Sequence, residues 1–342
     1  MTQRFVRLLI GLIGSSWLVA GGWWLANTAS VGAQGPAERG AARAPHSPAR
    51  TPLERCGDLL AFQVRLDRQA FSPGEIDGRA GTKLAHALTA LQTAWDLPAT
   101  GKPDCDTWRA LGGDGATPSL TTYVVTADDV NGPFEKLIPR ALPDQAALPA
   151  LGYQSVLEML AERFHTSPAL LRQLNPRVPI EAGRHIQVPN VVSFDPDKKP
   201  ALDPSAANVT VLVSKEESSL RIDGADGTLL FFAPVTTGGR YDPLPEGDWK
   251  VTGVSWHPVF HYNPDLFWDA KPGDSKATIK PGPNNPVGVV WISLNLEHYG
   301  LHGSPEPGRI GQTESHGCVR LTNWDAARVA SMVRPGTPVM FR

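Results

Sequence analysis

The sequence predicts a multidomain protein with a small three-helix domain, an α+β module, and a mostly β domain that carries one helix near its C-terminal end. Three observations support this fold class. The chain has 342 residues, which is too many for one ordinary core. Apolar residues recur at three- and four-residue spacing in the first third, as they do on amphipathic helices. From residue 208 onward, short strand patterns alternate with turns.

Composition and charge narrow the class of protein further. Hydrophobic residues make up 41% of the chain and charged residues 19%, which is typical of globular proteins. The formal net charge is -2, so the chain lacks the basic excess that binding to nucleic acid requires. We therefore expect no nucleic acid among its partners. The 33 Gly and 32 Pro residues predict many turns and extended connections.

Residues 1–33 are typical of a secretory signal. Arg4 and Arg7 precede a long apolar run, and the small residues Val31 and Ala33 follow it. This order predicts cleavage after Ala33. The apolar run is also close to the ~20 residues that span a bilayer, so an uncleaved inner-membrane anchor stays open as the alternative. In both cases the rest of the chain is exported, and we expect it in the periplasm or elsewhere in the cell envelope.

The chain has three cysteines, Cys56, Cys105 and Cys318. In an oxidising compartment an odd number leaves one thiol unpaired. Cys56 and Cys105 flank one short segment, whereas Cys318 lies far along the chain. The simplest pairing joins Cys56 to Cys105 in a disulfide. That pairing leaves Cys318 with the free thiol that a catalytic cysteine requires.

A flexible linker at residues 34–52, rich in Ala, Pro and Arg, leads into a small helical domain at residues 53–112. The stretch GEIDGRAGTKLAHALTALQTAWDLPATGKPDCDTWRAL resembles the three-helix type of peptidoglycan-binding domain. The motifs that carry this resemblance are Asp77-Gly78, Leu91-Gln92, the turn from Leu97 to Gly101, and Thr107-Trp108 with Leu111. The resemblance implies binding to the cell-wall polymer. A helical spacer without a ligand is the alternative.

Residues 121–191 predict a strand around Tyr123, two short helices, and a closing strand in the stretch AGRHIQVPN. This order resembles a LysM-type module, which implies binding to glycan. An insertion from Asn131 to Gly152 departs from the LysM pattern. A linker rich in Pro, Asp and Lys follows at residues 195–207.

Residues 208–342 predict a mostly β domain, either a sandwich or an open barrel with long loops. The turn from Asp223 to Gly227 joins two of its strands as a hairpin. One helix is expected from Asn323 to Val333, with Thr322 or Asn323 as its N-cap. The expected strands are Val209–Val213, Ser219–Ile222, Thr228–Thr236, Trp249–Val254, Val287–Leu294 and Val339–Phe341.

The chemistry of this domain centres on two strings, Tyr-Gly-Leu-His-Gly-Ser at residues 299–304 and Ser-His-Gly-Cys-Val-Arg-Leu at residues 315–321. A thiol becomes a nucleophile when a nearby imidazole takes its proton, and His302 and His316 are both candidates for the base of Cys318. If the segment is extended, the side chains of His316 and Cys318 point to the same side.

Other residues near the thiol have supporting chemistry. Gly303 and Gly317 allow backbone N–H groups to come close to a ligand, and such groups stabilise an oxyanion. Arg320 adds a positive charge that favours a thiolate or holds a substrate carboxylate. Zinc binding is the alternative use of this cluster, because it contains four possible ligands. The four are His298, His302, His316 and Cys318.

The stretch HGSPEPGRIGQTESHGCVRL resembles the active-site signature of the L,D-transpeptidase (YkuD-like) catalytic domain. The stretches TTGGRYDPLPEGDWKV and NPVGVVWISL upstream also resemble that family. The resemblance implies that Cys318 is the nucleophile and His302 the general base, with no metal and no organic cofactor. The residues that would shape the site, supply backbone donors or orient the loop are Ser315, His316, Gly317 and Arg320.

The chemistry implied by this resemblance is acyl transfer on peptidoglycan. The thiol attacks a tetrapeptide stem, releases D-alanine and forms a thioester. An amine of a second stem then completes a 3-3 crosslink, or an amine of an outer-membrane lipoprotein is attached instead. Attack by water would make the enzyme an L,D-carboxypeptidase. A non-catalytic wall-binding protein is a further alternative, which the intact set of His302, Gly317, Cys318 and Arg320 disfavours. The N-terminal modules would raise the local substrate concentration by tethering the enzyme to its polymer.

Overall fold

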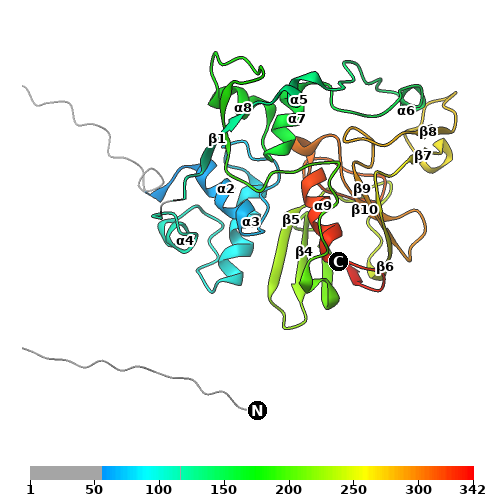
Figure 1. Ribbon diagram of the computed structural model, residues 1–342. Coiled ribbons are helices and arrows are strands. Elements are labelled where there is room, and N and C mark those ends of the chain that lie inside the picture. The colour runs from blue at the N-terminus through cyan, green and yellow to red at the C-terminus, as the bar shows by residue number, and fades with distance from the viewer. Residues whose placement is uncertain (1–55, 116) are drawn as a thin grey trace, which may run out of the picture. The chain divides into compact units, whose positions relative to one another are not determined.

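The computed structural model describes residues 56–115 and 117–342 (Figure 1). The predicted signal or anchor at residues 1–33 and the predicted linker at residues 34–52 lie outside the described residues. Within the described ranges, no helix is long and apolar enough to cross a membrane. All the described residues fall in one unit of the chain by their contacts.

The first domain is helical, as the sequence predicted. Its helices are α2 (Leu59–Arg68), α3 (Thr82–Ala94) and α4 (Cys105–Ala110). Phe62, Leu66 and Leu88 lie together in its core. A disulfide joins Cys56 to Cys105, with the two Cα atoms 5.2 Å apart. The bridge therefore ties the first turn of α4 to the residues that precede α2.

Two buried glutamines explain the motifs of this domain. Gln92 accepts a hydrogen bond from the N–H of Gly101 (2.8 Å) and donates one to the hydroxyl of Thr107 (2.8 Å). Gln63 accepts from the N–H of Gly78 (2.7 Å) and donates to the carboxylate of Asp77 (2.9 Å). Because a buried amide must find partners for its donors and acceptor, each glutamine fixes one loop.

The second module contains the predicted strand, two helices and strand, with two further helices between the first strand and the two predicted helices. Its elements are β1 (Leu120–Val124), α5 (Ala127–Asn131), α6 (Leu142–Gln145), α7 (Val156–Arg163), α8 (Pro168–Leu174) and β2 (His185–Pro189). Strands β1 and β2 pair antiparallel, with Leu120 opposite Pro189. Leu160, Leu171 and Ile186 share its core. Helix α6 lies within the predicted insertion, and α5 lies just before it.

An eight-stranded sheet dominates the last domain, which is mostly β as predicted, with strand order β11-β10-β9-β6-β12-β3-β4-β5. Helix α9 (Asn323–Met332) is buried along most of its length, and its Val329 shares a core with Val211 and Phe341 of the sheet. Thr322 is the N-cap of α9. The strands and short helices are η1 (Pro204–Ala207), β3 (Val209–Ser214), β4 (Ser219–Gly224), β5 (Leu229–Pro234), β6 (Gly247–Trp256), β7 (Phe260–Tyr262), η2 (Pro264–Leu266), β8 (Ala277–Ile279), β9 (Val290–Leu294), β10 (Gly300–His302), η3 (Pro307–Arg309), β11 (Val319–Arg320) and β12 (Pro338–Phe341). Strands β7 and β8 form a separate two-stranded hairpin.

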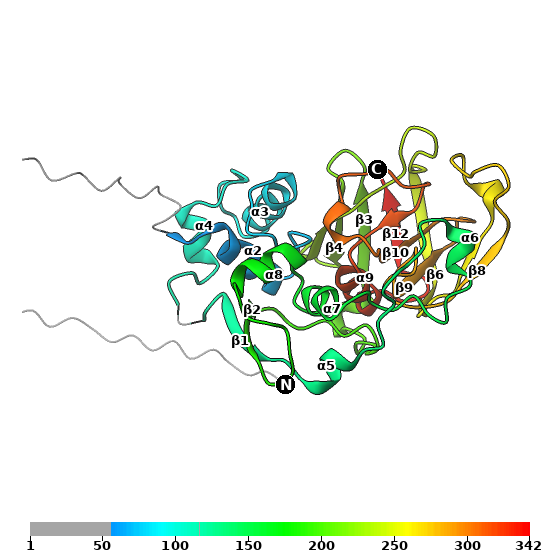
Figure 2. The ribbon, with the colours of Figure 1, turned by 90° about the horizontal axis from the view of Figure 1, so that it is seen from above.

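The modules pack directly on one another. The N–H of Ser72 donates to the carbonyl of Phe232 (2.8 Å), and the N–H of Phe232 donates to Ala70 (2.9 Å), so the first domain is hydrogen-bonded to β5. Helix α7 meets the start of α9 (Figure 2), where the side chain of Asn323 donates to Glu162 at 2.6 Å. The segment 195–207, which the sequence predicted as a linker, ends in η1, where Ala206 is buried. The described modules therefore contact one another directly and are not separated by flexible linkers.

Candidate active site

Two neighbouring strands bring the predicted catalytic residues together. Strands β10 and β11 run parallel, with Leu301 opposite Val319 and His302 opposite Arg320. Leu301 and Val319 are buried in the core of the domain. Because side chains alternate along a strand, His302 and Arg320 share the other face, and Cys318 directly precedes β11.

The thiol of Cys318 is partly buried and free of any disulfide. Its Sγ donates to the backbone carbonyl of His298 at 3.5 Å. Burial raises the pKa of the Cys318 thiol to about 11, although the N–H of Gly300 and the charge of Arg320 act in the opposite direction. The thiol is therefore protonated at neutral pH in the ligand-free protein.

The imidazole of His302 is buried and firmly oriented. Its Nδ1 lies 2.7 Å from the carbonyl oxygen of Gly303, and its ring stacks on Trp291 with the centroids 5.4 Å apart. A carbonyl oxygen only accepts, so Nδ1 carries the proton and Nε2 keeps the lone pair that a base needs. Burial, and then the charge of Arg320, lower the pKa of His302 to about 3.

The loop between Ser315 and Cys318 is bent, not extended. Gly317 has a φ of +93°, and a Cβ there would lie 2.5 Å from the ring of Tyr299. The hydroxyl of Ser315 donates to the carbonyl of Cys318 and closes the bend. The condition under which His316 and Cys318 were expected on the same side is therefore not met, because the segment is not extended.

His316 is directed at a different part of the domain. Its Nε2 lies 2.7 Å from Oδ1 of Asp269, and its ring lies against Phe267 with the centroids 4.7 Å apart. The structure thus separates the two predicted histidines. His302 shares a strand face with Arg320 beside the thiol, whereas His316 anchors its loop to the segment that follows η2.

Arg320 is held by the loop after β5. The backbones of Thr236 and Arg320 exchange two hydrogen bonds, at 3.0 and 2.8 Å, and the N–H of Ser315 donates to Thr237 (2.9 Å). Burial lowers the pKa of Arg320. Its Nε has no hydrogen-bond partner among the described residues. Its charge acts on both Cys318 and His302.

The side chain of Asn323 explains why residue 303 is a glycine. The sequence predicted Asn323 only as a possible helix cap. A Cβ at position 303 would collide with Oδ1 of Asn323, which accepts a hydrogen bond from the N–H of Val289 (3.2 Å). Asn323 is fully buried and so supports the strand end that carries His302. Asp269 and Trp291 were also missed, since neither stands in a motif that signals contact with a histidine.

The zinc alternative requires several of these side chains to converge. Across residues 56–115 and 117–342, the structure assembles no group of three His, Cys, Asp or Glu side chains that could hold a metal ion. His298 points toward Glu297, His302 toward Gly303 and His316 toward Asp269. The three histidines are therefore directed at three different partners.

Comparison with known proteins identifies this domain. The family model of the L,D-transpeptidase catalytic domain (YkuD) matches residues 208–340. The last domain belongs to the L,D-transpeptidase family. A second family model, described as "Putative peptidoglycan binding domain", matches residues 57–111, so the first domain is of that family. The LysM resemblance of residues 121–191 stays a prediction.

Curated relatives agree with the assignment of the L,D-transpeptidase domain. The "Putative L,D-transpeptidase YkuD" of Bacillus licheniformis is 28% identical over 186 residues, covering 54% of this chain and 91% of the relative. The "Probable L,D-transpeptidase YbiS" of Escherichia coli is 33% identical over 92 residues, covering 27% of this chain and 29% of the relative. A solved L,D-transpeptidase from Mycobacterium smegmatis is 19% identical, with a TM-score of 0.33 and coverage of 48% of this chain and 76% of that one.

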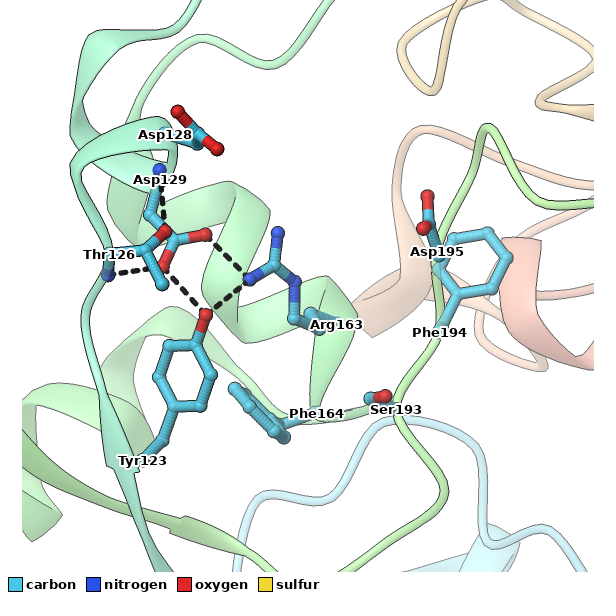
Figure 3. Close-up of a pocket in the computed structure, with 9 residues that line it drawn as sticks. All are labelled: Tyr123, Thr126, Asp128, Asp129, Arg163, Phe164, Ser193, Phe194 and Asp195. Carbon is cyan, nitrogen blue, oxygen red and sulfur yellow. Dashed lines mark hydrogen bonds and ion pairs between the residues drawn. The ribbon is translucent and has the colours of Figure 1, made fainter.

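A separate pocket of about 480 Å³ lies outside the L,D-transpeptidase site (Figure 3). It is lined by Tyr123, Thr126, Asp128, Asp129, Arg163, Phe164, Ser193, Phe194 and Asp195. Asp129 bonds to Tyr123 (2.7 Å), to Arg163 (2.6 Å) and to the N–H of Thr126 (2.8 Å), as Figure 3 shows. Burial alone would raise the pKa of Asp129, but these bonds outweigh it and lower the pKa. The network is satisfied within itself and contains none of the predicted catalytic residues.

Proposed function

We propose that this protein is an L,D-transpeptidase of the cell envelope that uses Cys318 as nucleophile and His302 as general base. One observation supports the assignment of roles. In a domain of the L,D-transpeptidase family, His302 at the end of β10 is paired with Arg320 of β11, and Cys318 directly precedes β11. The substrate is peptidoglycan, for which the matched binding domain at residues 57–111 is the second support.

The first half-reaction starts from a neutral thiol and a neutral imidazole. With a pKa of about 11 for Cys318 and about 3 for His302, neither group is charged at neutral pH. The proton therefore moves from Sγ to Nε2 of His302 while the S–C bond to the stem carbonyl forms. Nδ1 donates to Gly303, which holds the ring in position for this transfer.

Backbone groups are available for the oxyanion that forms next. Among the described residues, the N–H groups of Gly317 and Cys318 donate to no other group. Such donors typically contribute about 3–4 kcal/mol each to the transition state. Collapse of the tetrahedral species breaks the C–N bond, and His302 returns the proton to the departing D-alanine. A thioester on Cys318 remains.

An acceptor amine completes the second half-reaction. The amine attacks the thioester carbonyl, His302 takes its proton, and the thiolate leaves and is reprotonated. The acceptor is an amine of a second stem, giving a 3-3 crosslink, or an amine of an outer-membrane lipoprotein. No metal and no organic cofactor takes part in this scheme, and Ser315, through its bond to the carbonyl of Cys318, keeps the loop bent throughout.

The N-terminal modules are proposed to hold the wall polymer. A hollow of about 530 Å³ lies between the Asp77–Arg79 loop and helix α8. Residues of both the peptidoglycan-binding domain and the second module line this hollow. We propose that the second module binds glycan as well. Co-sedimentation of the full chain with purified wall sacculi tests this part separately from catalysis. Recovery of the chain only in the supernatant would contradict it.

The experiment that tests the function uses defined tetrapeptide stems and mass spectrometry of the products. The wild-type protein should release D-alanine and form a crosslinked dimer, whereas Cys318→Ala should form neither. A tripeptide without a dimer would mean that water is the acceptor and that the enzyme is an L,D-carboxypeptidase. Turnover by Cys318→Ala above about a tenth of wild type would refute the nucleophile, because covalent catalysis cannot survive loss of the thiol.

A further inference from the structure

The insertion that departs from the LysM pattern packs against the L,D-transpeptidase domain. We call residues 132–152 the brace and residues 260–279, which contain β7 and β8, the arm. Figures 1 and 2 both show α6 of the brace beside β8 of the arm. Leu151 of the brace and Tyr262 and Ile279 of the arm are all buried in one cluster. The partly buried members of this cluster are Ile138, Leu142, Leu148, Phe260, Phe267 and Ala277.

Backbone hydrogen bonds reinforce this contact. The N–H of Leu151 donates to the carbonyl of Pro281 (3.0 Å), and the N–H of Asn284 donates to the carbonyl of Leu151 (2.9 Å). The side chain of Asn284 donates to the carbonyl of Gly152 (2.9 Å). Gly282 has a φ of +148°, and a Cβ there would collide with the backbone of Leu151. The brace is thus joined to the end of the arm through main-chain atoms on both sides.

The arm in turn reaches the active-site loop. Tyr262 packs on Phe267 with the ring centroids 5.2 Å apart, and Phe267 packs on His316 at 4.7 Å. Asp269 accepts the hydrogen bond of His316 Nε2 at 2.7 Å. The other ring nitrogen, Nδ1, is buried and has no partner among the described residues. The bond to Asp269 is therefore the one described side-chain hydrogen bond that orients His316.

The arm needs support that the sheet does not give it. Strands β7 and β8 have three residues each and pair only with one another. An isolated two-stranded hairpin is marginal in water and requires packing on another element. The brace covers this hairpin with the apolar cluster around Leu151. Without the brace, Phe267 and Asp269 would lose the structure that holds them against His316.

We propose that the brace positions the active-site loop for catalysis, acting through the arm and Asp269 on His316. Asp269 and Ile138 are positioning residues, and neither touches the reacting atoms. His316 stands two residues before the thiol, so a change in its orientation moves the bend that presents Cys318. The proposal rests on the proposed function only for its turnover measurements.

The test compares Asp269→Ala and Ile138→Ala with Leu137→Ala as the matched control. Leu137 neighbours Ile138 but is 79% exposed, so its truncation leaves the cluster intact. In the full chain, Asp269→Ala should lower kcat about tenfold or more while KM changes little, because a small misplacement of reacting groups is costly. Ile138→Ala should act in the same direction, and Leu137→Ala should behave as wild type.

A second readout needs no substrate. Cys318 is the one thiol outside a disulfide, so its alkylation by iodoacetamide can be followed by mass spectrometry. Loosening of the bend exposes Cys318, and the alkylation rate at pH 8 should rise about threefold or more in Asp269→Ala and Ile138→Ala. Melting temperatures measured in parallel identify any variant that has unfolded.

Two further variants separate positioning from a merely structural role. Asp269→Asn keeps an oxygen that accepts from His316, and it should recover at least about half of kcat because the bond's geometry is retained. The double variant Ile138→Ala/Asp269→Ala should be no worse than Asp269→Ala, since residues acting through one path are not additive. Additive losses, or an alkylation rate unchanged in folded Asp269→Ala, would overturn the proposal. Unchanged turnover in folded Asp269→Ala would overturn it as well, whereas the identity of the nucleophile is tested separately by Cys318→Ala.

Discussion

The free energy of unfolding should fall when the pH is raised from 6.5 to 8, because two buried carboxyl groups lose protons in that window. Glu162 of α7 accepts a hydrogen bond from Asn323 at 2.6 Å, and Asp325 of α9 accepts from Ser72 at 2.9 Å. Both lie where the N-terminal modules meet the start of α9. Their ionisation therefore acts on the contact between the modules.

Burial controls both groups. It raises the pKa of Glu162 to about 8, although the hydrogen bond from Asn323 opposes this. It raises the pKa of Asp325 to about 7, although the hydrogen bond from Thr322 opposes this. In the unfolded chain the two groups have their ordinary values near 4. The native state thus binds more protons than the unfolded state from about pH 4 up to each folded pKa, and stability is lost progressively across that range.

The magnitude follows from the linkage relation. Each group that is protonated only in the native state lowers stability by about 1.4 kcal/mol per pH unit. From pH 6.5 to 8, Glu162 contributes a little under 2 kcal/mol and Asp325 a little under 1 kcal/mol, about 2.5 kcal/mol together. The low pKa of His302 opposes this loss by only about 0.4 kcal/mol, because its stabilising effect is nearly complete once the pH exceeds the unfolded value of about 6.5.

The assay is urea unfolding at pH 6.5 and at pH 8 for the wild type and for Glu162→Gln/Asp325→Asn. The double variant carries neutral amides, so its two unfolding free energies should agree to within about 1 kcal/mol. Glu181→Gln is the control, because its side chain is 63% exposed and its loss should leave the wild-type difference unchanged. A difference between the two pH values that is equally large in the double variant would refute the assignment.

Four further predictions concern the site and the disulfide. His302→Ala should lower kcat by about 10²–10⁴-fold in the stem-peptide assay, as expected for loss of a general base. Gly317→Ala should also impair turnover, because the φ of +93° and the ring of Tyr299 leave no room for a Cβ; wild-type kcat would contradict this. A chelator should leave activity unchanged, and loss that zinc restores would revive the metal alternative. Non-reducing peptide mapping should find Cys56 joined to Cys105, and reduction should cost about 4 kcal/mol for a loop of 49 residues in the chain-entropy model.

Local patterns were sufficient to predict several elements of the last domain, although not the short strands β10 and β11, where the predicted catalytic residues lie. Alternation at Val209–Val213 predicted a strand, and β3 buries every second residue. Thr322 was one of two candidates for the N-cap of α9, and its hydroxyl accepts from the N–H of Asp325. His302 is the last residue of β10, and Cys318 directly precedes β11, the strand that pairs with β10. For β3 and α9 the signal lies within a few residues of the feature that it predicts.

The contacts that position those residues could not be predicted in this way. Asp269 and His316 are 47 residues apart, and neither periodicity nor spacing signals that they meet. The insertion at residues 131–152 was recognised only as a departure from a pattern. Its role depends on Leu151 packing against Ile279, a contact that the fold creates over 128 positions of sequence. Side chains that meet through tertiary packing leave no local signature.

The first turn of α9 joins the catalytic strand to both N-terminal modules. The chain passes from Arg320 into α9, where Asn323 bonds to Glu162 and lies against Gly303, the neighbour of His302. Trp324 stacks on His165 with the centroids 5.0 Å apart, and Asp325 accepts from Ser72. A wall-binding domain on a free linker would act only by raising local concentration. Here both N-terminal modules share buried polar contacts with the start of α9, a few residues after Cys318, so they are held in a fixed position relative to that residue.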